Sequence, residues 1–398
     1  MTSNQEAIGN GGITTAPHAL ASQAGLDVLR DGGTAVEACV AMAATLAVVY
    51  PHMTGIGGDG FWLIHEPEGR VHAIDACGGA AMAADLSLYQ GLKVIPWRGP
   101  LAANTVAGTI SGWQAALAGD DGSLGLARLL RDAIKLAQGG VPVTAGGADI
   151  ARLKHAELHG LVGAYADIFA PEGRPLGQDD ILRQPQLART LQSLADQGLE
   201  SFYRGDLAQS IAADLAALGS PVSLEDLQRH RASTPAPLSI SVSGARLFNT
   251  APPTQGLAAL LILALFDRLP PSEAESFAHV HGLVEATKQA FLVRNRHVGD
   301  PAYMAVSAQQ ILDDTARIAG MVDAIDPRRA LPWPAPSAHG DTTWFGAADG
   351  RGQVVSCIQS TYFEFGSGLV LPETGITWQN RGASFTLDAD GPNVLRPG

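Results

Sequence analysis

Asp341, Thr342 and Thr343 stand in a row near the end of the chain, and Thr342 has the clearest potential for nucleophilic chemistry. A threonine hydroxyl is a poor nucleophile unless a base lies beside it. One solution is an N-terminal threonine, whose own α-amine accepts the proton. Thr342 gains that amine only if the chain is cut between Asp341 and Thr342. The preceding segment, 331–336, is proline-rich and expected to be exposed, so a cut there is tolerable.

The same threonine also fits an ordinary position in a β-hairpin. Residues 343–348 and 353–360 have the composition of two strands, and the turn between them contains two glycines. A β-branched residue at the start of a strand suits a pleated surface. Taken alone, Thr342 is a strand residue, and the rest of the chain must decide whether it is also a nucleophile.

Other kinds of reactive site are more weakly indicated. His281 and Glu285 would share a helix face, but His279 would not, and no further acidic or histidine cluster completes a metal site. Cys77 has no histidine placed beside it, so we expect a small buried core residue. No Gly-x-Ser-x-Gly motif indicates a hydrolase serine. We therefore expect neither a metal nor a cofactor.

A glycine-rich segment, 54–60, could indicate phosphate binding. It leads into the apolar run 61–64, which is typical of a strand, and no Lys-Ser or Lys-Thr pair follows it. The phosphate-binding and dinucleotide-binding loops both need a helix N-terminus at this point. We expect these glycines to allow close packing of backbone against backbone instead.

The composition indicates a tightly packed protein without a nucleic-acid partner. Of its 398 residues 46% are hydrophobic and only 16% are charged, which favours a large interior. A formal net charge of −13 argues against nucleic acid and against an anionic membrane surface, because both bind basic faces. Cys39, Cys77 and Cys357 are far apart and predict neither a disulfide framework nor a cysteine zinc site.

The N-terminal residues 1–6 carry neither the basic nor the apolar region of a secretory signal, so we expect a cytoplasmic location. The most apolar stretch, 35–50, contains Glu37 and is shorter than the ~20 apolar residues of a membrane span. We expect a buried helix there, begun by a capping box between Thr34 and Glu37. Strand pairs followed by groups of helices indicate a layered α+β protein. Further strands are expected over 8–15, 61–64, 71–75 and 238–248, and further helices over 20–29, 124–137, 257–269 and 279–294.

Several separated segments together resemble the γ-glutamyltransferase family of N-terminal-nucleophile hydrolases. Each alone is weak, but their joint order extends over nearly the whole chain. The segments are 28–38, 55–61, 202–205, 252–256, 299–301, 341–343 and 365–368.

The resemblance implies a four-layer αββα sandwich of the α+β class, made as one precursor that cleaves itself between Asp341 and Thr342. Residues 1–341 would be the large-subunit portion of this single domain, and 342–398 the start of the small catalytic subunit. The family's small subunit is longer, so its C-terminal part is expected to be missing, and an inactive truncated fragment is one alternative. The two fragments are expected to stay associated, and a homo-oligomer of that heterodimer is possible.

The resemblance also implies the chemistry. Thr342 would be the nucleophile with its own amine as base, and Ser360 falls where the family places a second hydroxyl that orients it. Acyl transfer would pass through an ester on Thr342 and end with release to water or an amine.

The residues that hold a γ-glutamyl group in this family are replaced here. No arginine follows Asp75, and Tyr362, Arg381 and Ser384 stand where the family has Asn, Gln and Asp. Each lost charged hydrogen bond weakens binding by about 1.5–3 kcal/mol. We expect Arg381, Tyr362 and Asn380 to bind substrate instead, with Arg381 suited to a carboxylate.

The runs 359–368 and 378–382 resemble the oxamate amidohydrolase branch of the family. This implies hydrolysis of a small amide acid such as oxamate to ammonia and a dicarboxylate. The alternatives are a γ-glutamyl hydrolase or transferase acting on glutathione-like substrates, and a deacylase of the cephalosporin acylase type.

Overall fold

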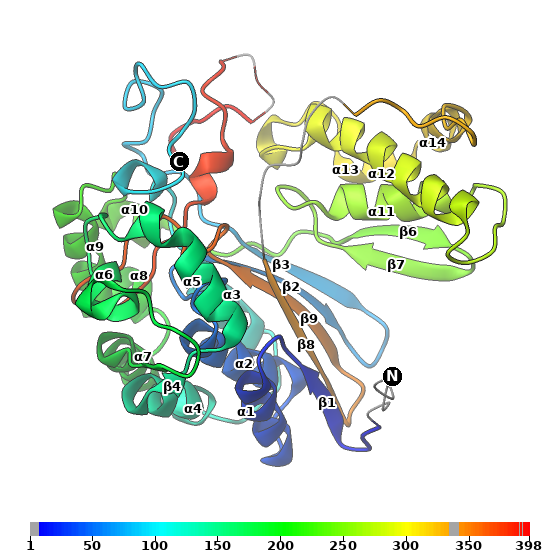
Figure 1. Cartoon of the computed structure of the whole chain (residues 1–398). Coiled ribbons are helices and arrows are strands. Elements are labelled where there is room, and N and C mark those ends of the chain that lie inside the picture. Colours follow the sequence, from blue (N-terminus) through cyan, green and yellow to red (C-terminus); the bar gives the residue numbers. More distant parts are fainter. Residues whose placement is uncertain (1–7, 334–341, 390, 392) are drawn as a thin grey trace.

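A five-stranded antiparallel sheet lies at the centre of the chain (Figure 1). The computed structural model describes residues 8–333, 342–389, 391 and 393–398, so Asp341 lies outside the described residues. Within the sheet the strand order is β1-β8-β9-β2-β3. The strands are β1 (Gly12–Thr15), β8 (Thr343–Asp349), β9 (Val354–Ser360), β2 (Asp59–His65) and β3 (Val71–Ala76).

The expected hairpin after Thr342 is present, and it lies in the middle of the sheet. β8 and β9 pair with each other, while β8 pairs with β1 and β9 pairs with β2. Strands from both sides of the predicted cut therefore share one sheet. The register places Ser360 opposite Asp59 on the neighbouring strand.

Helices cover one face of this sheet (Figure 1). Helix α2 (Ala35–Val49) is buried along its whole length, as its small and apolar residues on every side require. Thr34 and Glu37 form the predicted capping box at its start. Helix α2 contacts α1 (Ala19–Arg30), α3 (Thr109–Ala118) and α4 (Leu126–Gly139). The other helices of this larger part are α5 (Ala145–Leu158), α6 (Tyr165–Phe169), α7 (Pro185–Gln197), α8 (Ser201–Arg204), α9 (Asp206–Ala217) and α10 (Leu224–Arg229).

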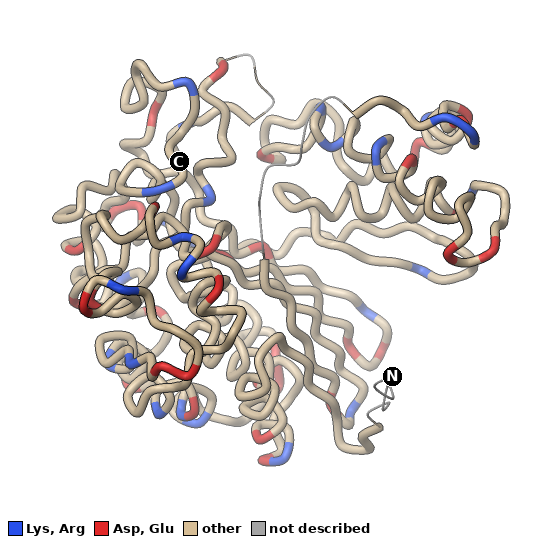
Figure 2. The backbone as a smooth tube through the Cα atoms, in the orientation of Figure 1, with Lys and Arg blue, Asp and Glu red and all other residues tan. Residues whose placement is uncertain are grey.

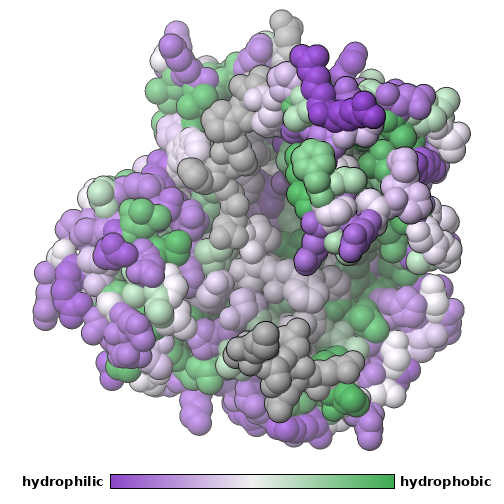
Figure 3. All heavy atoms as spheres, turned by 45° about the vertical axis from the view of Figure 1, so that its right-hand side comes forward, coloured by the Kyte–Doolittle hydropathy of each residue, from purple (hydrophilic) through white to green (hydrophobic). Residues whose placement is uncertain are grey.

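A smaller lobe with a hydrophobic core of its own lies at the upper right of Figure 1. Its two-stranded sheet packs against α11, and green apolar side chains are visible on the lobe in Figure 3. The lobe comprises β6 (Leu238–Val242), β7 (Ala245–Asn249), α11 (Gly256–Phe266), α12 (Phe277–His297), α13 (Ala308–Asp313) and α14 (Thr315–Asp323). The single strand expected over 238–248 is thus wrong. The chain turns back at Ser243 and Gly244, whose φ angles of 48° and 80° lie in the left-handed region.

The α+β class is confirmed, and the described residues form a sheet layer and a helical layer of the expected four-layer sandwich. The other face of the sheet is only partly covered, since Ile13, Trp344 and Val354 are exposed there. Acidic and basic residues are interspersed along the chain in the view of Figure 2. Within the described ranges, no helix combines the length and apolarity needed to cross a membrane.

The glycine-rich segment before β2 packs backbone against backbone, as expected. A Cβ atom on Gly57 would lie 2.3 Å from the carbonyl oxygen of Thr377, and one on Gly58 would lie 2.1 Å from that of Ser360. Neither carbonyl belongs to a flexible side chain that could move aside. This segment therefore fixes the position of the strand end that carries Ser360.

Replacing Gly58 with alanine is expected to lower the free energy of unfolding by about 1–3 kcal/mol, because the methyl group has no room. Denaturant titration of the purified protein measures this loss. Gly146→Ala in α5 is the matched control, since nothing lies within 4 Å of its Cβ position. An equal loss in both variants would contradict the packing explanation.

Candidate active site

The sheet brings the two predicted hydroxyl groups together. Thr342 is exposed just before β8, and its Oγ1 donates a hydrogen bond to Oγ of Ser360 at 3.3 Å. Ser360 is 2% exposed and also accepts a hydrogen bond from the backbone N–H of Tyr362 at 2.9 Å. Two donors thus fix the orientation of the Ser360 hydroxyl, which in turn holds the side chain of Thr342.

The loop after β9 has an unusual backbone conformation at Tyr362. Its φ of 82° is rare for a residue with a side chain, and such conformations are held by their surroundings and cluster at functional sites. The support comes from Asn380, whose backbone N–H donates to the carbonyl oxygen of Thr361 at 3.2 Å. Its Oδ1 accepts from the N–H of Phe363 at 3.1 Å, and its Nδ2 donates to the carbonyl oxygen of Trp97 at 2.8 Å.

Asn380 is fully buried, and both polar atoms of its amide bond to backbone groups. The structure gives it the role of supporting this loop. The substrate contact predicted for Asn380 from the sequence stays a prediction, because its amide has a second N–H and a second lone pair beyond these two bonds. Tyr362, by contrast, lies beside Arg381, whose Cζ is 5.5 Å from the centre of the Tyr362 ring.

Arg381 begins the short helix η4 (Arg381–Ser384), and its side chain is 15% exposed. Its Nε donates to the carboxylate of Asp59, and its Cζ lies 5.3 Å from the centre of the Phe61 ring. Within the part of the chain that the structure describes, its two Nη atoms have no hydrogen-bond partner. The guanidinium is therefore fixed by the hydrogen bond from Nε and by the rings of Phe61 and Tyr362. Its Nη groups can still donate hydrogen bonds to an anion.

Asp59, which the sequence reasoning missed, is the buried partner of Arg381. It is wholly buried, and its Oδ1 accepts hydrogen bonds from the N–H of Gly78 at 3.0 Å and from Nε2 of Gln379 at 3.1 Å. An unpaired carboxylate would be very unfavourable here, so Asp59 and Arg381 depend on each other. The sequence did contain a signal for this ion pair, because Asp59 lies in a glycine-rich and apolar segment. An aspartate buried in such a segment is seldom without a charged or hydrogen-bonding partner.

The thiol of Cys77 is part-buried, and its Sγ lies 3.8 Å from Oδ2 of Asp59. Burial raises the pKa of the Cys77 thiol well above its ordinary value, and the nearby carboxylates raise it further. A thiol in that state is not a nucleophile. Cys77 is only partly buried and not the core residue expected from the sequence, although its surroundings make the thiol unreactive.

A serine and a histidine also lie in contact behind the site, and sequence reasoning did not find them. Oγ of Ser111 is 2.8 Å from Nε2 of His230. The same hydroxyl donates to the carbonyl oxygen of Gly108 at 2.7 Å, so it accepts from the imidazole instead of giving it a proton. Burial lowers the pKa of His230 to about 4. This pair is a buried structural contact and not a nucleophile with its base.

Two of the three residues considered for a metal, His281 and Glu285, have other hydrogen-bond partners. Glu285 is buried, and its carboxylate accepts from Nζ of Lys288 at 2.6 Å and from the N–H of Leu331 at 3.0 Å. Nε2 of His281 lies 2.8 Å from the carbonyl oxygen of Asp326. These contacts hold the chain at Leu331 against α12.

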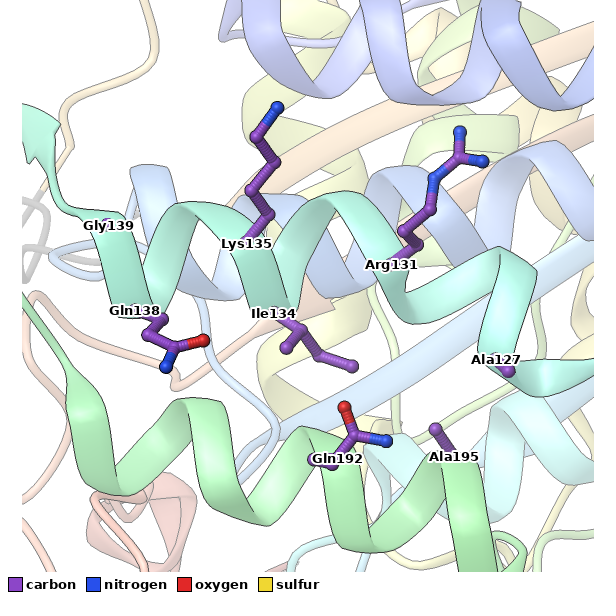
Figure 4. Close-up of a pocket in the computed structure, with 8 residues that line it drawn as sticks. All are labelled: Ala127, Arg131, Ile134, Lys135, Gln138, Gly139, Gln192 and Ala195. Carbon is purple, nitrogen blue, oxygen red and sulfur yellow. The ribbon is translucent and has the colours of Figure 1, made fainter.

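A surface groove of about 530 Å³ lies between α4 and α7, apart from the predicted site residues (Figure 4). Ile134 and Gln192 point toward each other across it, whereas the charged ends of Arg131 and Lys135 point away. The groove is open, and the polar side chains directed into it are the uncharged amides of Gln138 and Gln192.

The chain is similar to several known proteins over most of its length. The family model described as gamma-glutamyltranspeptidase matches residues 21–398. The oxamate amidohydrolase proenzyme of Klebsiella pneumoniae is 50% identical over 391 residues, which are 97% of this chain and 74% of that protein. The glutathione hydrolase-like YwrD proenzyme of Bacillus subtilis is 38% identical, over 99% of this chain and 75% of that protein. Among solved structures, the cephalosporin acylase from Bacillus halodurans superposes with a TM-score of 0.92 at 34% identity, covering 100% of this chain and 74% of that one.

Proposed function

Because the chain belongs to the gamma-glutamyltranspeptidase family of hydrolases, we propose that it is a self-cleaving threonine amidohydrolase acting on a small amide acid such as oxamate. One observation carries the proposal. The Thr342–Ser360 hydroxyl pair lies next to Asp59 through the β9–β2 register, and Asp59 holds an arginine with open donors. The hydroxyl pair and the arginine thus lie at the same end of the sheet, which supports the proposal of a nucleophile beside a carboxylate-binding group.

Self-cleavage would begin with attack of Thr342 Oγ1 on the carbonyl carbon of Asp341. The peptide C–N bond breaks as its nitrogen takes up a proton, which gives an ester between Asp341 and the Thr342 side chain. Water then hydrolyses that ester and leaves a free α-amine on Thr342. The two fragments would remain together, since β8 and β9 lie between strands of the larger one.

Turnover would use the same oxygen with the new amine as base. The amine takes the hydroxyl proton while Oγ1 attacks the amide carbon of the substrate, and the proton passes to the departing ammonia. Water hydrolyses the resulting ester. Arg381 would hold the substrate carboxylate through its Nη atoms, and Ser360 would keep the Thr342 hydroxyl oriented.

The proposed substrate is tested by comparing oxamate with a γ-glutamyl anilide on the self-cleaved protein. We expect oxamate to be hydrolysed with at least tenfold higher kcat/KM, because each missing charged contact to a glutamyl group loses about 1.5–3 kcal/mol. Ammonia release follows the first reaction and aniline absorbance the second. Faster turnover of the γ-glutamyl compound would favour the glutathione-hydrolase alternative, whose relatives include the YwrD protein.

A further inference from the structure

A second carboxyl group, that of Asp75, is near enough to the guanidinium of Arg381 to interact with it through charge. Asp59 on β2 is bonded to it directly. Asp75 on β3 stands opposite Phe61 in the register, and the Phe61 ring lies beneath Arg381. Cys77 links the two acids, because its N–H donates to Oδ1 of Asp75 at 2.9 Å and its thiol faces Oδ2 of Asp59.

The charges around Asp75 can be counted from each element packed against it. Asp59 comes from β2, and Arg381 from η4, while the thiol of Cys77 is neutral. The segment on its other side pairs with it only through backbone bonds to Ser233, and nearby His230 is neutral. Since Asp59 already balances Arg381, an ionised Asp75 leaves the pocket with a net negative charge.

This net negative charge disfavours the binding of a substrate that presents a carboxylate without a neighbouring ammonium group. We propose that Asp75 is a specificity-determining residue, which must carry a proton when Arg381 receives a carboxylate that has no ammonium group beside it. The inference rests on the proposed function and defines the charge of its substrate. A substrate with an ammonium group could instead bind while Asp75 is ionised.

The surroundings of Asp75 set the pH above which carboxylate binding requires its protonation. Burial raises the pKa of Asp75 to about 6; the Cys77 N–H opposes this, and Asp59 adds to it. Below that pH the group is neutral and a carboxylate binds without proton uptake. Above it, binding takes up one proton, so affinity falls up to about tenfold for each further pH unit.

The test measures oxamate binding by calorimetry between pH 5 and 8, in the full chain carrying Thr342→Ala so that nothing is turned over. Asp75→Asn is added to that background, because an amide oxygen can still accept from the Cys77 N–H. At pH 8 the Asn variant should bind oxamate at least about tenfold more tightly than its parent, and at pH 5 the two should agree. In the parent, titrations in two buffers should show uptake of close to one proton at pH 8. Asp149→Asn removes the same charge at an exposed position of α5 and should leave the parent's pH dependence unchanged.

Equal pH dependence in the parent and the Asp75→Asn variant would overturn the assignment. If oxamate binds to neither uncut protein at any pH, ammonia release by the self-cleaved protein decides whether oxamate is the substrate. Formate, the smallest carboxylate, then serves as the probe for Asp75, with the same pH dependence expected. A flat formate profile in the parent would reject the role of Asp75 independently of oxamate.

Discussion

A chain in which Thr342 is replaced by alanine is expected to stay uncut and to hydrolyse no amide. Removal of a nucleophile that also starts self-processing eliminates both reactions, and a loss of at least about 10⁴-fold in kcat is typical for such a group. Gel electrophoresis and mass spectrometry would show a single chain instead of fragments 1–341 and 342–398. Ammonia release from oxamate would measure the lost turnover.

Thr343→Val is the matched control for this experiment. Thr343 is the next residue, and its buried hydroxyl has no hydrogen-bond partner among the described residues. Removal of that hydroxyl should leave both cleavage and turnover intact. A Thr342→Ala chain that is still cut at the same bond would reject Thr342 as the nucleophile.

Replacing Arg381 with glutamine is expected to raise KM for oxamate by at least about 100-fold, with a smaller change in kcat. Two charge-assisted hydrogen bonds to the substrate carboxylate, each of about 1.5–3 kcal/mol, would be lost. The same change leaves Asp59 buried without its partner, which lowers the free energy of unfolding by about 3–5 kcal/mol. Steady-state kinetics and denaturant titration measure the two effects separately.

The double variant Asp59→Asn with Arg381→Gln distinguishes binding from folding. It removes both charges, so most of the lost stability should return. The affinity for oxamate should not return, because no cation is left in the pocket. Recovery of both properties together would mean that Arg381 acts only through stability.

Features formed by residues close in sequence could be predicted, whereas contacts between residues far apart in sequence could not. The hairpin beginning at Thr343 and the capping box at Thr34 follow from local patterns, and both are present. The ion pair between Asp59 and Arg381 joins residues 322 positions apart, so no spacing reveals it. Arg381 was accordingly expected as a cation facing only the substrate, whereas it already holds one carboxylate.

Asn380 illustrates a different difficulty. An amide beside a cation in a polar run suits a substrate contact, and nothing in the run tells which backbone groups will lie around it. Those groups come from Phe363 and from Trp97, on two separate loops. Only the folded chain shows that the amide bonds to both of them.

The order of strands in the central sheet has a consequence for synthesis. The first strand pairs with one that begins after residue 342, so Gly12 finds its partner Asp349 only when most of the chain has left the ribosome. Such distant pairings form late in folding, because the entropy lost on closing a long loop precedes the stabilising contacts of the paired strands. Self-cleavage that requires Thr342 to be held by Ser360 of this sheet would then occur only in chains in which β1 has paired with β8. The cut would act as a checkpoint that admits only chains with an assembled sheet to activity.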